Sequence, residues 1–321
     1  MSQDAHELIE RHLPDFPRKH VGRLFTDTTE FMDIGYGDVI RLGGDHYLVL
    51  RDEAERRFGM EDPKYWVKRC RRLETGERRI LKLVFYEDFP VRIGEFEIRC
   101  HRSPVKEARI LKLVRGDARF MQGVTVPDAK GNPVRVLEVV FGKRLDETVE
   151  DIEADHATYF REHFPGILAK FVGACEAIKH LHDNWEKHGD IRRDHLWVEH
   201  GTGAYRWIDF DYTFDFHENP FGLDLFGLGN ILIFLTGKMI YTPQSMAETG
   251  FPPDVMASIT PEDYSLFFPN RMINLRKLFP YIPEELNRVL LHFSAGSFVF
   301  YESVDELLAE LRPCLSLLAG S

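Results

Sequence analysis

The chain has 321 residues, which is too long for one compact core and predicts two lobes or domains. Its net charge of −11 argues against a nucleic-acid backbone as the main partner. The four cysteines contain no C-x-x-C spacing, so we expect free thiols rather than a disulfide framework or a zinc site.

We expect a cytoplasmic protein that neither spans nor binds a membrane. The acidic, mixed N-terminus is unlike a signal peptide. The longest apolar run, residues 225–235, is too short to span a bilayer and contains Asn230.

Residues 1–36 are expected to form an N-terminal extension. One short helix is predicted at residues 6–13, with Leu8, Ile9 and Leu13 on one face. We expect this helix to pack against the first lobe.

Residues 37–86 contain the patterns of antiparallel strands separated by turn signals. The four expected strands are residues 39–42, 46–50, 65–68 and 80–85. The last two are expected to pair across Glu74-Thr75-Gly76-Glu77. Lys82 lies between apolar neighbours on the fourth strand, where an ammonium group is costly unless it is paired.

A helix is predicted after this sheet. Ser103 suits the N-cap and Pro104 suits the first helical position, so Glu107 falls in the first turn. Farther along, a buried strand is expected at residues 134–140. The pattern of the later residues is mainly that of helices. The expected later helices are residues 164–183, 225–235, 284–293 and 304–311.

The most informative stretch begins with H-G-D-I-R-R-D-H at His188. A short hairpin follows, with strand-like residues 196–198 and 205–208 on either side of a glycine-containing turn. It leads into D-F-D at Asp209, and then into D-L-F-G-L-G at Asp224. Carboxylates at the ends of adjacent short strands suit a metal-phosphate site, because Mg²⁺ prefers oxygen ligands.

These three motifs, in this order, resemble the catalytic core of the protein-kinase-like fold. The resemblance implies an α+β bilobal fold with an antiparallel β-rich N-lobe and a mainly helical C-lobe. On that basis the N-lobe covers residues 37–140, including a helix, and the C-lobe covers residues 141–321 with the catalytic loop.

In the first lobe, the resemblance implies that Lys82 binds the α- and β-phosphates of ATP and is held by Glu107. Glu95 and Glu97 are rival partners if the helix begins earlier, and an edge-strand lysine facing water is the alternative reading of Lys82.

The resemblance also locates the nucleotide-binding backbone. Residues 51–63 form the linker where the family has its glycine-rich phosphate loop, and this linker contains only Gly59. The main-chain groups of Glu138 and Val140 would contact adenine, and Leu137 would be the gatekeeper residue.

In the second lobe, Asp190 is implied to take or orient the proton of the acceptor hydroxyl. Asp209 would bind the metal ion that bridges the phosphates, and Arg192 would stabilise the transferring phosphoryl group. Asp224 would brace the catalytic loop, and His188 would pack beside it.

His195 occupies the position where the family has an asparagine that binds a second metal ion. Imidazole is a poor ligand for Mg²⁺ and a better one for Mn²⁺ or Zn²⁺. Four alternatives remain open: one metal ion suffices, a softer ion is used, Asp194 helps, or catalysis is lost.

The resemblance therefore implies an ATP-dependent phosphotransferase with Mg²⁺ or Mn²⁺, similar to serine/threonine protein kinases, acting on a protein or small-molecule hydroxyl. The interval from Asp209 to Asp224 is too short for the usual peptide platform, which favours a small-molecule kinase. A pseudokinase that binds nucleotide or a partner without turnover is the alternative from another class.

Overall fold

The computed structural model describes residues 4–57, 60–93, 96–215 and 218–319. The protein has a mixed α+β architecture and divides into two compact units. Unit 1 contains Met1–Glu87 and Arg102–Val140, and unit 2 contains Asp88–His101 and Phe141–Ser321. The chain therefore crosses between the units three times.

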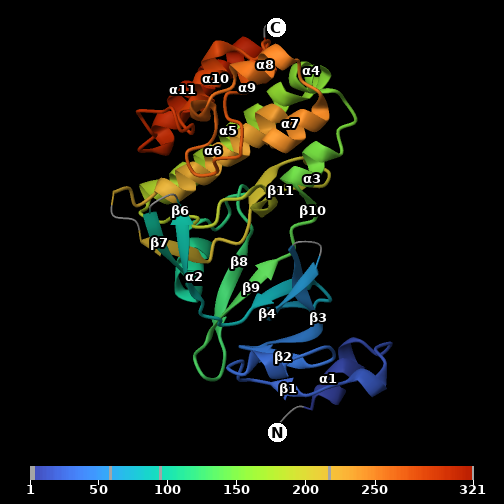
Figure 1. The fold of residues 1–321 in the computed structure, drawn as a ribbon. Helices are drawn as coiled ribbons and strands as arrows, with labels where there is room; N and C mark the ends of the chain where they lie inside the picture. The colour runs from blue at the N-terminus through green and yellow to red at the C-terminus, as the bar shows by residue number, and fades with distance from the viewer. Residues whose placement is uncertain (1–3, 58–59, 94–95, 216–217, 320–321) are drawn as a thin grey trace. The chain divides into compact units, whose positions relative to one another are not determined.

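Unit 1 is built on a seven-stranded sheet with the order β1-β2-β3-β4-β5-β9-β8 (Figure 1). The strands are β1 (Leu24–Phe25), β2 (Val39–Leu42), β3 (Asp45–Arg57), β4 (Met60–Arg72), β5 (Arg78–Lys82), β8 (Gly123–Pro127) and β9 (Pro133–Glu138). All neighbours are antiparallel except β1 and β2. The predicted pairing of β4 with β5 is confirmed, and β2 pairs with β3 across the turn between them.

The expected linker at residues 51–63 is wrong, because most of it continues β3 and β4 as a paired hairpin. Opposite charges across the two strands favour this pairing: Lys68 Nζ lies 2.7 Å from Asp52 Oδ1, and Arg69 pairs with Glu53. Gly59 lies outside the described residues.

The N-terminal segment is part of the core of unit 1. The predicted helix is present as α1 (Ala5–His12), capped by the Asp4 side chain. Leu8 and Ile9 are each 2% exposed and pack with Val39 and Leu48 of the sheet. The alternate side chains of β2 and β3 point to the other face of the sheet. They pack there with side chains of β4, β5 and β9.

The predicted start of the next helix is confirmed. In α2 (Pro104–Leu113) the Ser103 hydroxyl accepts a hydrogen bond from the Lys106 N–H, and Pro104 occupies the first turn. Glu107, Ile110 and Leu111 are buried, so the helix turns one carboxylate and its apolar stripe inward.

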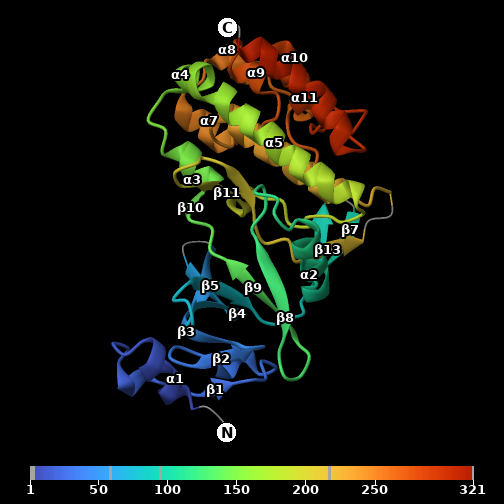
Figure 2. The ribbon, with the colours of Figure 1, turned by 180° about the vertical axis from the view of Figure 1, so that it is seen from behind.

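Unit 2 is mainly helical (Figure 2). Its helices are α3 (Leu145–Glu150), α4 (His156–Thr158), α5 (Phe164–Asp183), α6 (Gly222–Gly237), α7 (Pro243–Thr249), α8 (Pro253–Ser258), α9 (Leu275–Leu278), α10 (Glu284–Leu291) and α11 (Val304–Ala319). The long helix α5 packs against both α6 and α11. Among the described residues, no helix has the length and apolar character needed to cross a membrane.

The predicted bounds of α5 are confirmed, whereas α6 begins earlier than expected. Its start at Gly222 puts Asp224 in the first turn of the helix. The helix continues through Gly237, and its C-cap residue Lys238 adopts the left-handed conformation with φ +61°.

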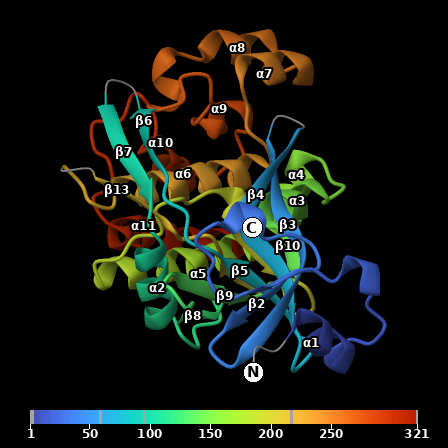
Figure 3. The same cartoon turned by 90° about the horizontal axis from the view of Figure 1, so that it is seen from below.

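Two small sheets complete unit 2. One joins β10 (Gly142–Arg144), β11 (Leu196–Glu199) and β12 (Tyr205–Trp207), which confirms the predicted hairpin after His195. The other has the order β13-β7-β6, from β6 (Asp88–Ile93), β7 (Phe96–Arg102) and β13 (Tyr212–Asp215) (Figure 3). Sequence reasoning missed this β6–β7 hairpin.

Replacement of Ile9 by alanine is expected to destabilise unit 1 by about 2–4 kcal/mol, because it removes a fully buried side chain and leaves a cavity. Urea unfolding measures the change, with Glu7→Ala on the exposed face of α1 as the control. An effect below about 0.5 kcal/mol would show that α1 is detached from the sheet in solution.

Candidate functional site

The loop after α5 is held by a buried carboxylate on α6. Asp224 Oδ2 accepts a hydrogen bond from the His188 N–H at 2.7 Å, and Oδ1 accepts one from the Gly189 N–H at 2.8 Å. His182 on α5 lies 3.0 Å from Oδ2 through its Nε2. One side chain therefore ties the loop to both long helices.

Burial alone would raise the pKa of Asp224. The hydrogen bond and charge of His182, with His188 and the Gly189 N–H, outweigh burial and lower the pKa below its ordinary value. The carboxylate is thus ionised at neutral pH although its residue is fully buried.

Two glycines allow the loop to approach its neighbours closely. Gly189 has φ +87°, and a Cβ there would lie 1.8 Å from the Tyr212 carbonyl oxygen. On α6, a Cβ at Gly227 would lie 2.6 Å from the Cβ of Ile191. The loop is thereby packed between the segment after Asp211 and helix α6.

The loop presents Asp190 beside a histidine and an arginine. His195 Nδ1 lies 2.9 Å from the Asp190 carbonyl oxygen and 3.4 Å from its Oδ2. Arg192 Nε lies 3.5 Å from Asp190 Oδ1. Burial raises the pKa of Asp190, and His195 and Arg192 partly oppose that shift. A carboxylate with a raised pKa is a better proton acceptor.

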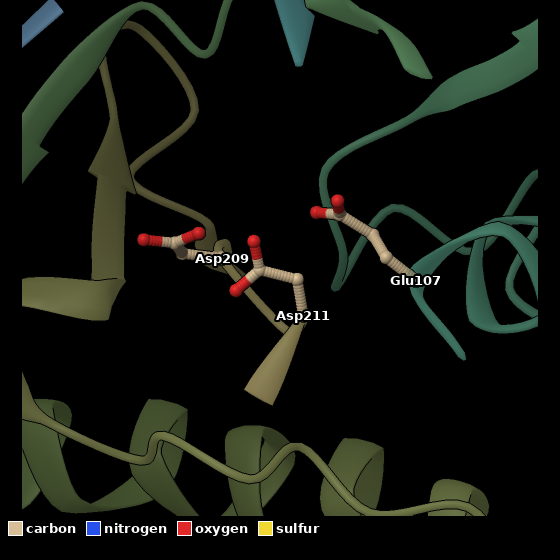
Figure 4. A group of neighbouring side chains, drawn as sticks. All are labelled: Glu107, Asp209 and Asp211. Atoms are coloured by element: carbon tan, nitrogen blue, oxygen red, sulfur yellow. The ribbon is translucent and has the colours of Figure 1, made fainter. Parts of the chain in front are cut away.

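Asp209 follows β12 and has φ +62°, in the left-handed region that aspartate tolerates better than most residues. Its Oδ2 lies 3.7 Å from His195 Nε2. Carboxylate oxygens of Asp209 and Asp211 lie within 4.8 Å of each other (Figure 4). These two side chains can provide the oxygen ligands that Mg²⁺ prefers.

In unit 1 the predicted ion pair is present. Lys82 Nζ lies 2.9 Å from Glu107 Oε1. Of the two other expected partners, Glu95 lies outside the described residues, and Glu97 is exposed. Arg135 of β9 shares the same carboxylate, with its Nε 3.0 Å from Glu107 Oε2. Figure 4 also draws Glu107, which belongs to this unit.

The expected adenine-binding backbone lies at the end of β9. The Glu138 N–H donates to the Gln122 carbonyl oxygen at 2.9 Å, so it is already engaged within unit 1. Leu137 is buried, Glu138 is exposed and Val140 is half-buried. The roles assigned to these residues stay predictions.

The structure therefore brings Asp190, Arg192, His195 and Asp209 together in unit 2, and Lys82 and Glu107 together in unit 1. Sequence reasoning missed Arg135 as the second partner of Glu107. The signal was a charged residue within the apolar run of β9.

It also missed the contribution of Asp211 as a second carboxylate beside Asp209, although the D-F-D spacing was visible. Neither a protein-family model nor a curated protein matches this sequence.

Replacement of Asp224 by asparagine is expected to lower the free energy of unfolding by about 2–4 kcal/mol. An amide has one acceptor oxygen, so at least one buried N–H group now faces an NH₂ group. Chemical denaturation measures the change, with Glu153→Gln at an exposed position as the control. Equal stability of both variants would contradict the bracing role.

Replacement of Arg135 by methionine is expected to cost more stability than replacement of Lys82 by methionine. In Lys82→Met, Arg135 still neutralises Glu107, so the loss of stability should be small. Arg135→Met removes a fully buried guanidinium from Glu107 and from the Leu83 carbonyl, and should cost about 3–5 kcal/mol. Thermal unfolding compares the two, and the reverse order would contradict this division of roles.

Proposed function

We propose that this protein is an ATP-dependent phosphotransferase with a bilobal protein-kinase-like fold, which transfers the γ-phosphate to a hydroxyl group. The observation that carries the proposal is the braced loop of unit 2. It presents the Asp190 carboxylate next to His195, and His195 in turn lies beside Asp209. Phosphoryl transfer needs such positioning and charge neutralisation more than covalent chemistry.

Within this proposal the residues divide the work by chemistry. Asp190 receives or orients the proton of the acceptor hydroxyl, and its raised pKa suits that role. Asp209 and Asp211 would hold a divalent ion, which supplies charge neutralisation at the phosphates when bound.

Lys82 would pair with the α- and β-phosphates, and Arg192 with the transferring phosphoryl group. The backbone of Glu138 and Val140 would meet adenine.

The acceptor is a protein or a small molecule. Between Asp211 and α6, residues 212–215 form β13, which is paired with β7. This leaves few residues for a peptide-docking platform, which favours a small-molecule hydroxyl as acceptor.

A pseudokinase is the second candidate, and two observations favour it. His195 stands where the resemblance implies an asparagine, and paired, charged strands occupy much of the expected phosphate loop. Such a protein would bind nucleotide or a partner without turnover.

Replacement of Asp190 by asparagine is expected to reduce phosphate transfer by at least about 10²-fold, since the proton acceptor is lost, while stabilisation by Mg²⁺-ATP remains. Asp209→Ala should abolish both, because the metal ligand is removed. At a hundredfold excess over Kd, ligand binding raises stability by about 2.7 kcal/mol. Thermal unfolding and transfer of labelled γ-phosphate measure the two effects.

Asp215→Asn, at an exposed position four residues after Asp211, is the matched control. Stabilisation by Mg²⁺-ATP without any Asp190-dependent transfer would favour the pseudokinase. Normal transfer by both site variants would show that the site is elsewhere.

A further inference from the structure

The guanidinium group of Arg192 lies among the polar side chains of the unit 2 site. Its Nη2 lies 2.7 Å from His195 Nε2 and 3.2 Å from Asp194 Oδ2, and its Nε lies 3.5 Å from Asp190 Oδ1. Three side chains of the same loop, those of Asp190, Asp194 and His195, therefore surround the guanidinium group.

These contacts define the tautomer of His195. A guanidinium group only donates hydrogen bonds, so His195 Nε2 must accept one and carries no hydrogen. The hydrogen is then on Nδ1, which donates to the Asp190 carbonyl oxygen at 2.9 Å. The imidazole is thus held at both nitrogens, and the electron pair on Nε2 is directed at Arg192.

A second Mg²⁺ ion is poorly served at this position. Mg²⁺ requires oxygen ligands in near-octahedral geometry, whereas His195 offers a nitrogen whose electron pair is already engaged. A metal ion would have to displace Arg192 and accept imidazole, and Mn²⁺ or Zn²⁺ are the ions that tolerate this ligand.

We propose that Arg192, held by His195 and Asp194, is a built-in cation that replaces the second divalent ion. The site then takes one divalent ion per nucleotide, on Asp209 and Asp211. This inference rests on the proposed phosphotransferase function.

The charges of the site agree with this assignment. Asp190, Asp194, Asp209 and Asp211 are four carboxyl groups on two short segments of unit 2. Arginine stays protonated at any physiological pH, and its planar fork matches the geometry of phosphate oxygens. A guanidinium group can therefore neutralise phosphate charge without depending on the supply of metal ions.

The test counts ions. Free Mn²⁺ is measured by electron paramagnetic resonance while Mn²⁺ is titrated into the full-length protein with a non-hydrolysable ATP analogue. We expect one bound Mn²⁺ per nucleotide in the wild type. His195→Asn removes the nitrogen that holds Arg192 and offers an amide oxygen as a metal ligand in its place. We therefore expect two bound ions in this variant.

Arg192→Met should also bind two Mn²⁺ ions, because the imidazole electron pair is then available. The second of these ions should not be displaced by excess Mg²⁺, since its ligand is a nitrogen. In His195→Asn, by contrast, Mg²⁺ should compete for both positions. Lys179→Met, at a partly exposed ion pair with Asp183 on α5, is the control and should keep one ion.

Two results would overturn the inference: two Mn²⁺ ions per nucleotide in the wild type, or one ion in the wild type and in both site variants. Failure of the wild-type protein to bind nucleotide would instead contradict the proposed function.

The tautomer of His195 can be measured without nucleotide. The ¹⁵N spectrum of histidine-labelled protein reports the tautomer of His195, assigned by its absence in His195→Asn. We expect the Nδ1–H form, with the Nε2 resonance shifted in Arg192→Met. The Nε2–H form would contradict the contact with Arg192 and overturn the inference.

Discussion

The interaction on which unit 2 depends is the grip of the Asp224 carboxylate on two backbone N–H groups of the loop. A buried charge is expensive unless it is fully hydrogen-bonded, and here three donors surround it. The position of Asp224 in the first turn of α6 also suits the helix dipole. The geometry of Asp190 is thus set by helices α5 and α6 rather than by the loop itself.

A comparable arrangement organises unit 1. Glu107 is fully buried and faces two cations, Lys82 and Arg135. These two cations compensate a carboxylate charge that would be costly if it were buried alone. Lys82 retains 7% side-chain exposure, whereas Arg135 has none. Arg135 acts as the structural partner, and Lys82 is the one nearer to solvent.

Local patterns were enough to predict much of the fold. Ser103 and Pro104 specify the start of α2 through hydrogen bonding and backbone geometry within one turn. The apolar spacing of α5 and the turn of the β11–β12 hairpin are similarly local. The pair of Lys82 with Glu107 was predicted through resemblance, and the distance agrees with it.

Interactions between distant segments were not predictable in this way. The approach of Arg135 to Glu107 depends on the order of β5 and β9 in the sheet, which no local pattern encodes. The hydrogen bond of Arg192 to His195 depends on the 3₁₀ turn at Arg193–His195, which brings positions three apart together. The charged strands β3 and β4 resembled a linker because their pairing is stabilised by ion pairs rather than by an apolar pattern.

The β6–β7 hairpin explains how a short segment after Asp211 acquires a fixed conformation. Phe214 of β13 is buried with Ile98 and Cys100 of β7, and Tyr212 packs edge-on against Phe89 at 5.4 Å. The Lys187 ammonium further donates to the Phe214 carbonyl oxygen at 2.7 Å. Strand pairing and burial thus order residues 212–215. Because β7 ends at Arg102 and Ser103 caps α2, the chain that orders β13 leads directly into the helix that carries Glu107.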